Sequence, residues 1–436
     1  MSKTANTMTP PNQDIQMERR RKLYGYSVVA ASTLAIFSLF GYRATFGVLK
    51  GAMSADMGWN QSEVALGYSL MMLCYAISAV FWGMMLDKIG AKLNFFVGSF
   101  LAAGGFYFTS LADSLYTYYA AFGLLSGLAT GMLWVSSTIT VRKWFVGKDY
   151  AKMFGFAFAG APLATIIMNL FVKQSLVNAS GGDGWRDALQ VLAIITLVLL
   201  LLAAFITKKA PENYGMKPFG QLENASGERI WSAKEAFSTF PVWGAILVFL
   251  TAMLGEFLIW TQVVSYWTTD LGMPLGKAAN IFMAIGFLGL VFMPVLGGIA
   301  DKVVQKSEDE IHGRKRMLIY SPIAGMLCTV ILLIQGFSPT GFGILFCVPF
   351  AAYWAIFSGG VYGYVGAVYG RVSLGKIAGI MSCIVMGTGP FLGPLIGGYL
   401  KDLTGSYQYS MVFALCAFTL SMLLATRLPR SVKAND

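Results

Sequence analysis

The sequence predicts an all-α membrane protein in which twelve transmembrane helices form two six-helix bundles. The first observation is composition: 56% of the 436 residues are hydrophobic and only 12% are charged, against about a quarter in soluble domains. The second is length, because twelve apolar segments can each cross about 30 Å of hydrocarbon. The third is a short string that recurs after almost half of the chain, as in a duplicated protein.

The apolar segments divide equally between the two halves of the chain. The first six run over residues 24–49, 62–86, 93–112, 115–141, 150–176 and 187–207, and the second six over 241–268, 276–300, 316–336, 341–369, 375–400 and 406–427. A membrane β-barrel is excluded, because its strands would be short and would alternate in hydrophobicity. We therefore expect an N-terminal tail (1–23), an N-terminal bundle (24–207), a linker (208–240), a C-terminal bundle (241–427) and a C-terminal tail (428–436).

The predicted linker is the longest break between apolar segments, and Pro211 and Pro218 are typical of such a connection. Ser232 and Glu235 have the spacing of a capping box, which predicts a short helix that leads into segment 241–268. A linker without this helix is the alternative.

Basic residues predict the orientation in the membrane, because Lys and Arg are retained in cytoplasmic loops. With the N-terminus inside, 25 of them fall on the cytoplasmic side and five on the other, namely Lys50, Lys173, Arg186, Lys277 and Lys401. We expect both termini in the cytoplasm and a multi-pass protein of the cell membrane, specifically a bacterial inner membrane.

The sequence lacks the residues that several classes of function require. The cysteines have no metal-ligand spacing and His312 is the only histidine, so we expect no metal and no cofactor. No phosphate-binding loop of the GxxxxGK[ST] type is present, so gradients must drive any transport. Nearly all of the basic residues lie in gaps between apolar segments, unlike those of a nucleic-acid-binding surface. No HExxH, paired-aspartate or nucleophile-elbow motif indicates an enzyme.

The recurring string is Gly-x-x-x-Asp-Lys, and its two copies lie 214 residues apart. Because each half has six segments, both copies fall on the same membrane face, as a parallel repeat requires. The residues concerned are Gly83, Asp87, Lys88, Gly90 and Lys92 in the first copy, and Gly297, Asp301 and Lys302 in the second.

The first copy matches in full the pattern G-x-x-x-D-[RK]-x-G-x-[RK], a loop signature of the major facilitator superfamily. With twelve segments, a half-chain repeat and a central linker, the sequence resembles that family over essentially its whole length. The resemblance implies the major facilitator fold and transport by alternating access. It also implies that the motif residues latch neighbouring helices at the cytoplasmic gate.

Two further strings resemble the monocarboxylate and oxalate/formate porter branch of that family. They are Gly41–Val48 in the first segment and Pro211–Gly215 in the linker. The resemblance implies secondary transport of small, monocarboxylate-like organic anions, coupled to protons or to exchange for another anion. An exporter of neutral or cationic drugs and a non-transporting membrane receptor are the alternatives. We expect a monomer.

Two charged residues lie deep within apolar segments, where a charge is expensive and usually functional. Arg43 and Glu256 are 213 residues apart, which is one short of the repeat offset, so they occupy nearly equivalent places in the two halves. We expect Arg43 to bind a substrate carboxylate through its planar guanidinium group and Glu256 to be the proton-coupling residue. The alternatives are a permanent ion pair, or an Arg43 side chain that extends to the outer interface.

Other polar and aromatic residues within the segments could complete a substrate pocket. The candidates for substrate contact are Tyr75, Asn169, Trp260 and Tyr353, and Tyr68 shares a face of segment 62–86 with Tyr75. For each of them, packing between helices is the alternative role.

Overall fold

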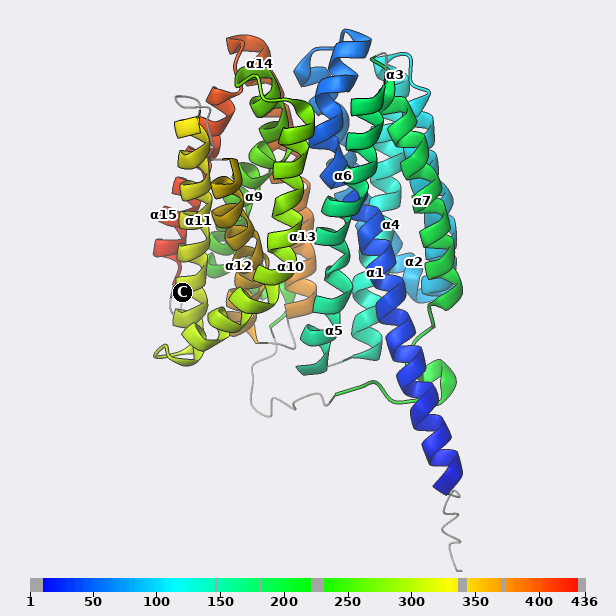
Figure 1. Ribbon diagram of the computed structural model, residues 1–436. Coiled ribbons are helices and arrows are strands. Elements are labelled where there is room, and N and C mark those ends of the chain that lie inside the picture. The colour runs from blue at the N-terminus through cyan, green and yellow to red at the C-terminus, as the bar shows by residue number, and fades with distance from the viewer. Residues whose placement is uncertain are drawn as a thin grey trace, which may run out of the picture.

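The computed structural model describes residues 11–145, 148–179, 182–220, 231–335, 343–370 and 374–429. The chain is nearly all helical (Figure 1), and twelve helices within these residues are long and apolar enough to cross a membrane. The predicted fold class is therefore confirmed.

The first six spans contain seven α-helices. Their bounds are α1 Pro11–Met57, α2 Gln61–Ser110, α3 Leu115–Tyr118, α4 Ser126–Trp144, α5 Lys148–Phe158, α6 Gly160–Asn178 and α7 Gly184–Ile206. Helix α2 contains the second and third spans, which meet at Gly90, where φ is 81° and ψ is 162°. Glycine is suited to this turn because a side chain is strained at positive φ.

The last six spans follow a short helix, α8 Ala233–Phe237. They are α9 Phe240–Ser265, which continues as a π-helix to Asp270, α10 Leu275–Gln305, α11 Glu310–Gln335, α12 Gly343–Tyr369, α13 Leu374–Met386, α14 Gly389–Thr404 and α15 Gln408–Arg427. Ser232 and Glu235 cap α8 reciprocally, so the helix predicted in the linker is confirmed. Helices α13 and α14 form one span that is interrupted just before Pro390, which cannot donate a backbone hydrogen bond.

Helix α1 is longer than the predicted segment 24–49 at both ends. Its start is stabilised by the linker, because Arg21 donates to the Pro218 carbonyl oxygen at 3.0 Å and lies 4.1 Å from the Phe219 ring centre. Near its other end, Asp56 accepts a hydrogen bond from the Trp185 indole at 2.9 Å. These contacts provide polar partners that hydropathy does not detect, so hydropathy marks only the apolar middle of the helix.

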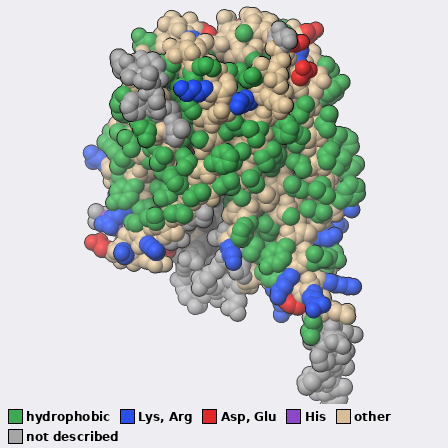
Figure 2. Space-filling model, viewed as in Figure 1, with side chains coloured by type: hydrophobic (Ala, Val, Ile, Leu, Met, Phe, Trp, Pro, Cys, Tyr) green, Lys and Arg blue, Asp and Glu red, His purple; other side chains and the backbone are tan. Residues whose placement is uncertain are grey.

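The start of α1, the end of α15 and the described linker residues 211–220 and 231–239 lie toward one end of the helices, which we call the proximal end (Figure 1). We call the opposite end the distal end. An apolar surface covers the middle of the face drawn in Figure 2, and charged side chains gather toward its two ends, as expected for a protein surrounded by lipid.

The two bundles touch through glycines at mid-depth and toward the distal end. A methyl group at Gly398 of α14 would lie 2.7 Å from the Gln61 carbonyl oxygen of α2. One at Gly47 of α1 would lie 2.8 Å from the Trp260 carbonyl oxygen of α9. Small residues allow this close backbone approach.

Hydrogen bonds also join the two bundles at the distal end. The Asp402 carboxylate accepts the backbone N–H groups of Gln61 and Ser62, at 3.1 and 2.8 Å, at the start of α2. The Tyr407 hydroxyl donates to the Gln61 side chain at 2.7 Å. The distal end is therefore closed in this structure.

The repeated motif is only partly within the described residues. The side chains of Asp87, Lys88 and Asp301, and the surroundings of Gly297, lie outside them. The predicted latch at the proximal gate therefore stays a prediction.

Candidate functional site

Arg43 lies at mid-depth between the two bundles. Because α1 runs on to Met57, Arg43 is fourteen residues, or about 21 Å, from the distal end of the helix. Its side chain is only 7% exposed and its guanidinium carbon lies 4.8 Å from the Tyr75 ring centre. The side chain thus remains inside the protein, and the alternative in which it extends to the outer interface does not hold.

Glu256 occupies the matching place in the second bundle, fourteen residues before the end of the α9 span at Asp270. Its side chain is 6% exposed. Arg43 is near enough to attract Glu256 electrostatically, but the two side chains form no ion pair in this structure. This conformation therefore does not contain the permanent ion pair between Arg43 and Glu256 that was the alternative.

Trp260 connects the second bundle directly to the backbone of Arg43. Its indole N–H donates to the Arg43 carbonyl oxygen at 2.7 Å. Its ring packs against Phe282, Phe350 and Trp354, with centroids 5.0 to 5.9 Å apart. Trp260 is thus a fixed aromatic wall between α1 and α12.

Asn169 of α6 faces the residue after Arg43. Its amide nitrogen donates to the carbonyl oxygens of Ala44, at 3.2 Å, and Thr165, at 2.9 Å. Since both neighbours are acceptors, the nitrogen must face them, and the side-chain oxygen has no donor within the described residues.

Two buried tyrosine hydroxyl groups complete the cluster. Tyr353 of α12 lies beside Glu256, and Tyr68 of α2 lies within electrostatic range of both Glu256 and Arg43. Neither hydroxyl has a hydrogen-bonding partner in the described part of the chain. The residues predicted from sequence thus gather at one place, and Tyr68, which shares a helix face with Tyr75, lies among them.

This central cluster contains several buried polar atoms that lack partners among the described residues. They are Nε and Nη2 of Arg43, Oε2 of Glu256, Oδ1 of Asn169 and the hydroxyl groups of Tyr68 and Tyr353. A buried polar atom without a hydrogen bond costs about 1–3 kcal/mol, so a polar ligand bound between the bundles would stabilise these atoms. One edge of the guanidinium group offers two donors, which suits a carboxylate.

Sequence reasoning missed Lys50 and Gln262, which meet on the distal side of this cluster. Lys50 was expected in a loop, but it lies within α1, fully buried, and donates a hydrogen bond to the Gln262 side-chain oxygen. Its spacing of seven residues from Arg43 is the signal that could have placed both on one helix face.

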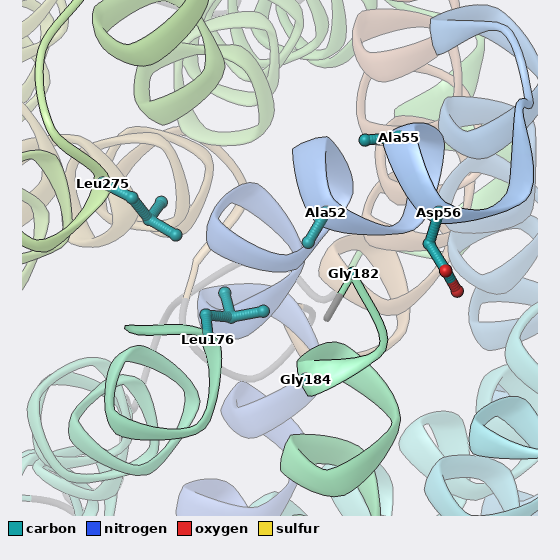
Figure 3. A pocket seen from close by; sticks show the side chains of 7 residues that line it. All are labelled: Ala52, Ala55, Asp56, Leu176, Gly182, Gly184 and Leu275. Carbon is teal, nitrogen blue, oxygen red and sulfur yellow. The ribbon is translucent and has the colours of Figure 1, made fainter. Parts of the chain in front are cut away.

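A pocket of about 390 Å³ lies at the distal surface, away from the central cluster (Figure 3). Its lining includes one charged residue, Asp56, and that carboxylate already accepts the Trp185 indole and lies 3.7 Å from Arg186 Nε. Apolar and small residues form the rest of the lining, so the pocket offers no cation to an anionic ligand. No group of three or more metal-ligating side chains is found among the described residues.

Comparisons with known proteins agree with this architecture. The sequence profile of the Major Facilitator Superfamily matches residues 31–386. The hexuronate transporter of Bacillus subtilis is 23% identical over 85% of this chain and 87% of its own length. Monocarboxylate transporter 12-B of Danio rerio is 25% identical over 77% of this chain and 72% of its own.

Solved structures share the fold. A bacterial homologue of the human lysosomal transporter Spinster superposes with a TM-score of 0.72 and 13% identity, covering 93% of this chain and 98% of its own. At this identity the likeness concerns the fold alone.

Proposed function

We propose that this chain, which belongs to the major facilitator superfamily of membrane transporters and is not an enzyme, carries small, monocarboxylate-like organic anions by alternating access. The observation that carries the proposal is Arg43, a buried guanidinium group between the bundles whose Nε and Nη2 have no acceptor among the described residues. A charge at this depth costs roughly 2.5 to 3.5 kcal/mol on insertion scales. A bound carboxylate would neutralise it through two hydrogen bonds.

The other members of the cluster take supporting roles in this proposal. Tyr75 and Trp260 would form aromatic walls of the substrate site, the former against the guanidinium group and the latter against the Arg43 backbone. Asn169 and Tyr353 present polar atoms without partners in the described structure, which would bind the remaining polar groups of the substrate.

Glu256 would couple transport to protons. A nearby cation favours the ionised form of a carboxyl group, and Arg43 lies within electrostatic range of Glu256 in the substrate-free protein. An anion bound to Arg43 cancels that effect, so Glu256 takes up a proton more readily. Substrate and proton would then cross together, while exchange of one anion for another needs no net proton movement.

Alternating access requires the two bundles to move relative to each other, and we assign the moving units to residues 24–207 and 241–427. Helix α6, the distal part of the fifth span, packs on α10, whereas α5, its proximal part, packs on α1 and α4. Together with the closed distal end, this favours a state in which substrate reaches the cluster from the proximal side. By the distribution of basic residues, that side is the cytoplasm.

Transport assays would test the substrate class. Reconstituted protein should take up radiolabelled lactate, glucuronate or sulfoacetate, and should not take up the lipophilic cation tetraphenylphosphonium. The names of relatives support these choices: besides the hexuronate and monocarboxylate transporters above, a protein of Cupriavidus necator that is 22% identical over 88% of this chain and 89% of its own length is named a probable sulfoacetate transporter, and all three substrates are organic anions. Uptake of the cation alone would contradict the proposal and favour a drug exporter, whereas binding without flux would favour a receptor.

Glu256→Gln should separate anion transport from proton transport. The amide keeps the shape of the protonated carboxyl group but cannot release a proton, so anion exchange should persist while anion-dependent acidification of the vesicle interior disappears. A pH-sensitive dye inside proteoliposomes measures this. Glu212→Gln, which changes an exposed carboxylate in the linker, is the control. Unchanged proton flux in Glu256→Gln would remove Glu256 from the mechanism.

A further inference from the structure

Lys50 lies on the same face of α1 as Arg43, two helical turns closer to the distal end. The distance along the helix is about 10 Å. Gly47, between them, packs against the Trp260 backbone of the second bundle. Lys50 therefore faces the other bundle, on the distal half of the boundary between them.

The direct partner of the buried Lys50 ammonium group is neutral. Its Nζ donates to the Gln262 side-chain oxygen and lies 5.1 Å from the Tyr407 ring centre. A second hydrogen bond fixes the orientation of the Gln262 amide, because its nitrogen donates to the Pro394 carbonyl oxygen at 3.1 Å. Gln262 thus points an acceptor at Lys50 but supplies no charge.

The two charged groups that act on Lys50, Asp402 and Lys401, are already engaged. Asp402 attracts Lys50 at a distance, but its carboxylate oxygens accept the N–H groups of Gln61 and Ser62. Lys401 pairs with Asp270 at 2.8 Å. Lys50 therefore forms no ion pair in the described structure.

Holding the bundles together does not explain why an ionisable amine stands at this buried place. Burying an ammonium group costs several kcal/mol unless a charged partner offsets it, and an uncharged side chain could bond to Gln262 without that cost. The structure contains such a comparison at its rim: Lys173 of α6 donates to the Asn280 side chain of α10 at 2.7 Å, in an exposed place. An ammonium group bonded to an amide costs little free energy in that exposed place, but several kcal/mol in the buried place of Lys50.

We propose that Lys50 is a second anion-binding residue, which receives the substrate carboxylate when the distal end opens and passes it to Arg43. This rests on the proposed function, since it assumes an anionic substrate that reaches Arg43. Parting of the bundles would separate α1 from α9 and release Lys50 from Gln262. Gln262 then serves as the uncharged partner of Lys50 whenever the distal end is closed.

Lys50→Gln should raise the half-saturating concentration for uptake from the distal side at least tenfold. The measurement uses proteoliposomes with the distal end outward, and whichever of lactate or glucuronate the wild-type protein transports. Lys50→Arg should stay within about threefold of wild type, because it keeps the charge. Lys173→Gln, the matched control, should stay within about twofold.

Two variants at Gln262 distinguish anion binding from simple closure and do not require Lys50→Gln to fold. Gln262→Glu places a carboxylate beside Lys50 that competes with the substrate, so the half-saturating concentration should again rise at least tenfold. Gln262→Ala leaves Lys50 charged and should not raise it. Equal values for these two variants, or an unchanged value for Lys50→Gln, would overturn the role of Lys50.

Equilibrium binding keeps this test separate from the proposed function. With the distal end closed, substrate binding at Arg43 should be within about threefold of wild type in Lys50→Gln. If the wild-type protein binds neither lactate nor glucuronate, the proposed function itself fails. If the wild-type protein binds the substrate normally but Lys50→Gln leaves the half-saturating concentration for distal uptake unchanged, only the inference about Lys50 fails.

Discussion

Arg43→Ala is expected to abolish uptake of the organic anion by reconstituted protein while the protein still folds. Hydrogen bonds to charged groups contribute about 1.5–3 kcal/mol each, and two of them join the guanidinium group to the carboxylate in our account. Their loss corresponds to at least about a hundredfold in affinity, at roughly 1.4 kcal/mol per tenfold. Arg43→Lys should recover only a small part of the activity, because a lysine cannot make the paired contact.

The control for this experiment is Arg20→Ala, which removes an exposed arginine of the same helix far from the cluster. It should transport at the wild-type rate. Thermal unfolding of each purified variant reports whether the fold is intact. Normal uptake by a folded Arg43→Ala variant would contradict the assignment of Arg43 as the anion anchor.

Gly398→Leu is expected to prevent the distal end from closing and thereby to stop transport. A Cβ at this position would lie 2.7 Å from the Gln61 carbonyl oxygen and from the Ser62 Cα, and backbone atoms cannot move aside as a flexible side chain can. Overpacking of this kind typically costs 1–3 kcal/mol or more, and here the cost falls only on the closed arrangement. The population should therefore shift toward a distal-open state.

A cysteine introduced at the buried Gln262 in a cysteine-free background would report this shift. An impermeant thiol reagent added on the distal side should label it slowly in the parent protein and rapidly when Gly398→Leu is present. Gly379→Leu is the matched control, because a side chain at that exposed position of the same span meets no neighbour within 4 Å. Equal labelling with and without Gly398→Leu would show that this contact does not control closure.

The arrangement of spans could be predicted from the sequence because membrane crossing depends on length and hydropathy, which are local properties. The two ends of α1 could not, since Arg21 and Asp56 are stabilised by residues distant in the chain, at Pro218 and Trp185. Hydropathy therefore ended the first span at residue 49, eight residues before Met57. That error placed Lys50 in a loop.

The central cluster was predictable where a residue is unusual for its surroundings. Arg43 and Glu256 are conspicuous as charges within apolar segments, and the half-chain repeat indicated that they occupy matching depths. Tyr68 is less conspicuous in sequence, because tyrosines also occur at lipid interfaces and in packing seams, and only the helix face that it shares with Tyr75 pointed to it. Its unpartnered hydroxyl and its place near both charges emerge only from the packing of α2.

A structure of the protein with a bound substrate carboxylate, chosen by the uptake assays, tests the central claim most directly. The account predicts carboxylate oxygens about 2.7–2.9 Å from Nε and Nη2 of Arg43, the usual length of such charged hydrogen bonds, with the ligand between α1 and α9. A carboxylate bound elsewhere, with Arg43 paired to Glu256 instead, would contradict it.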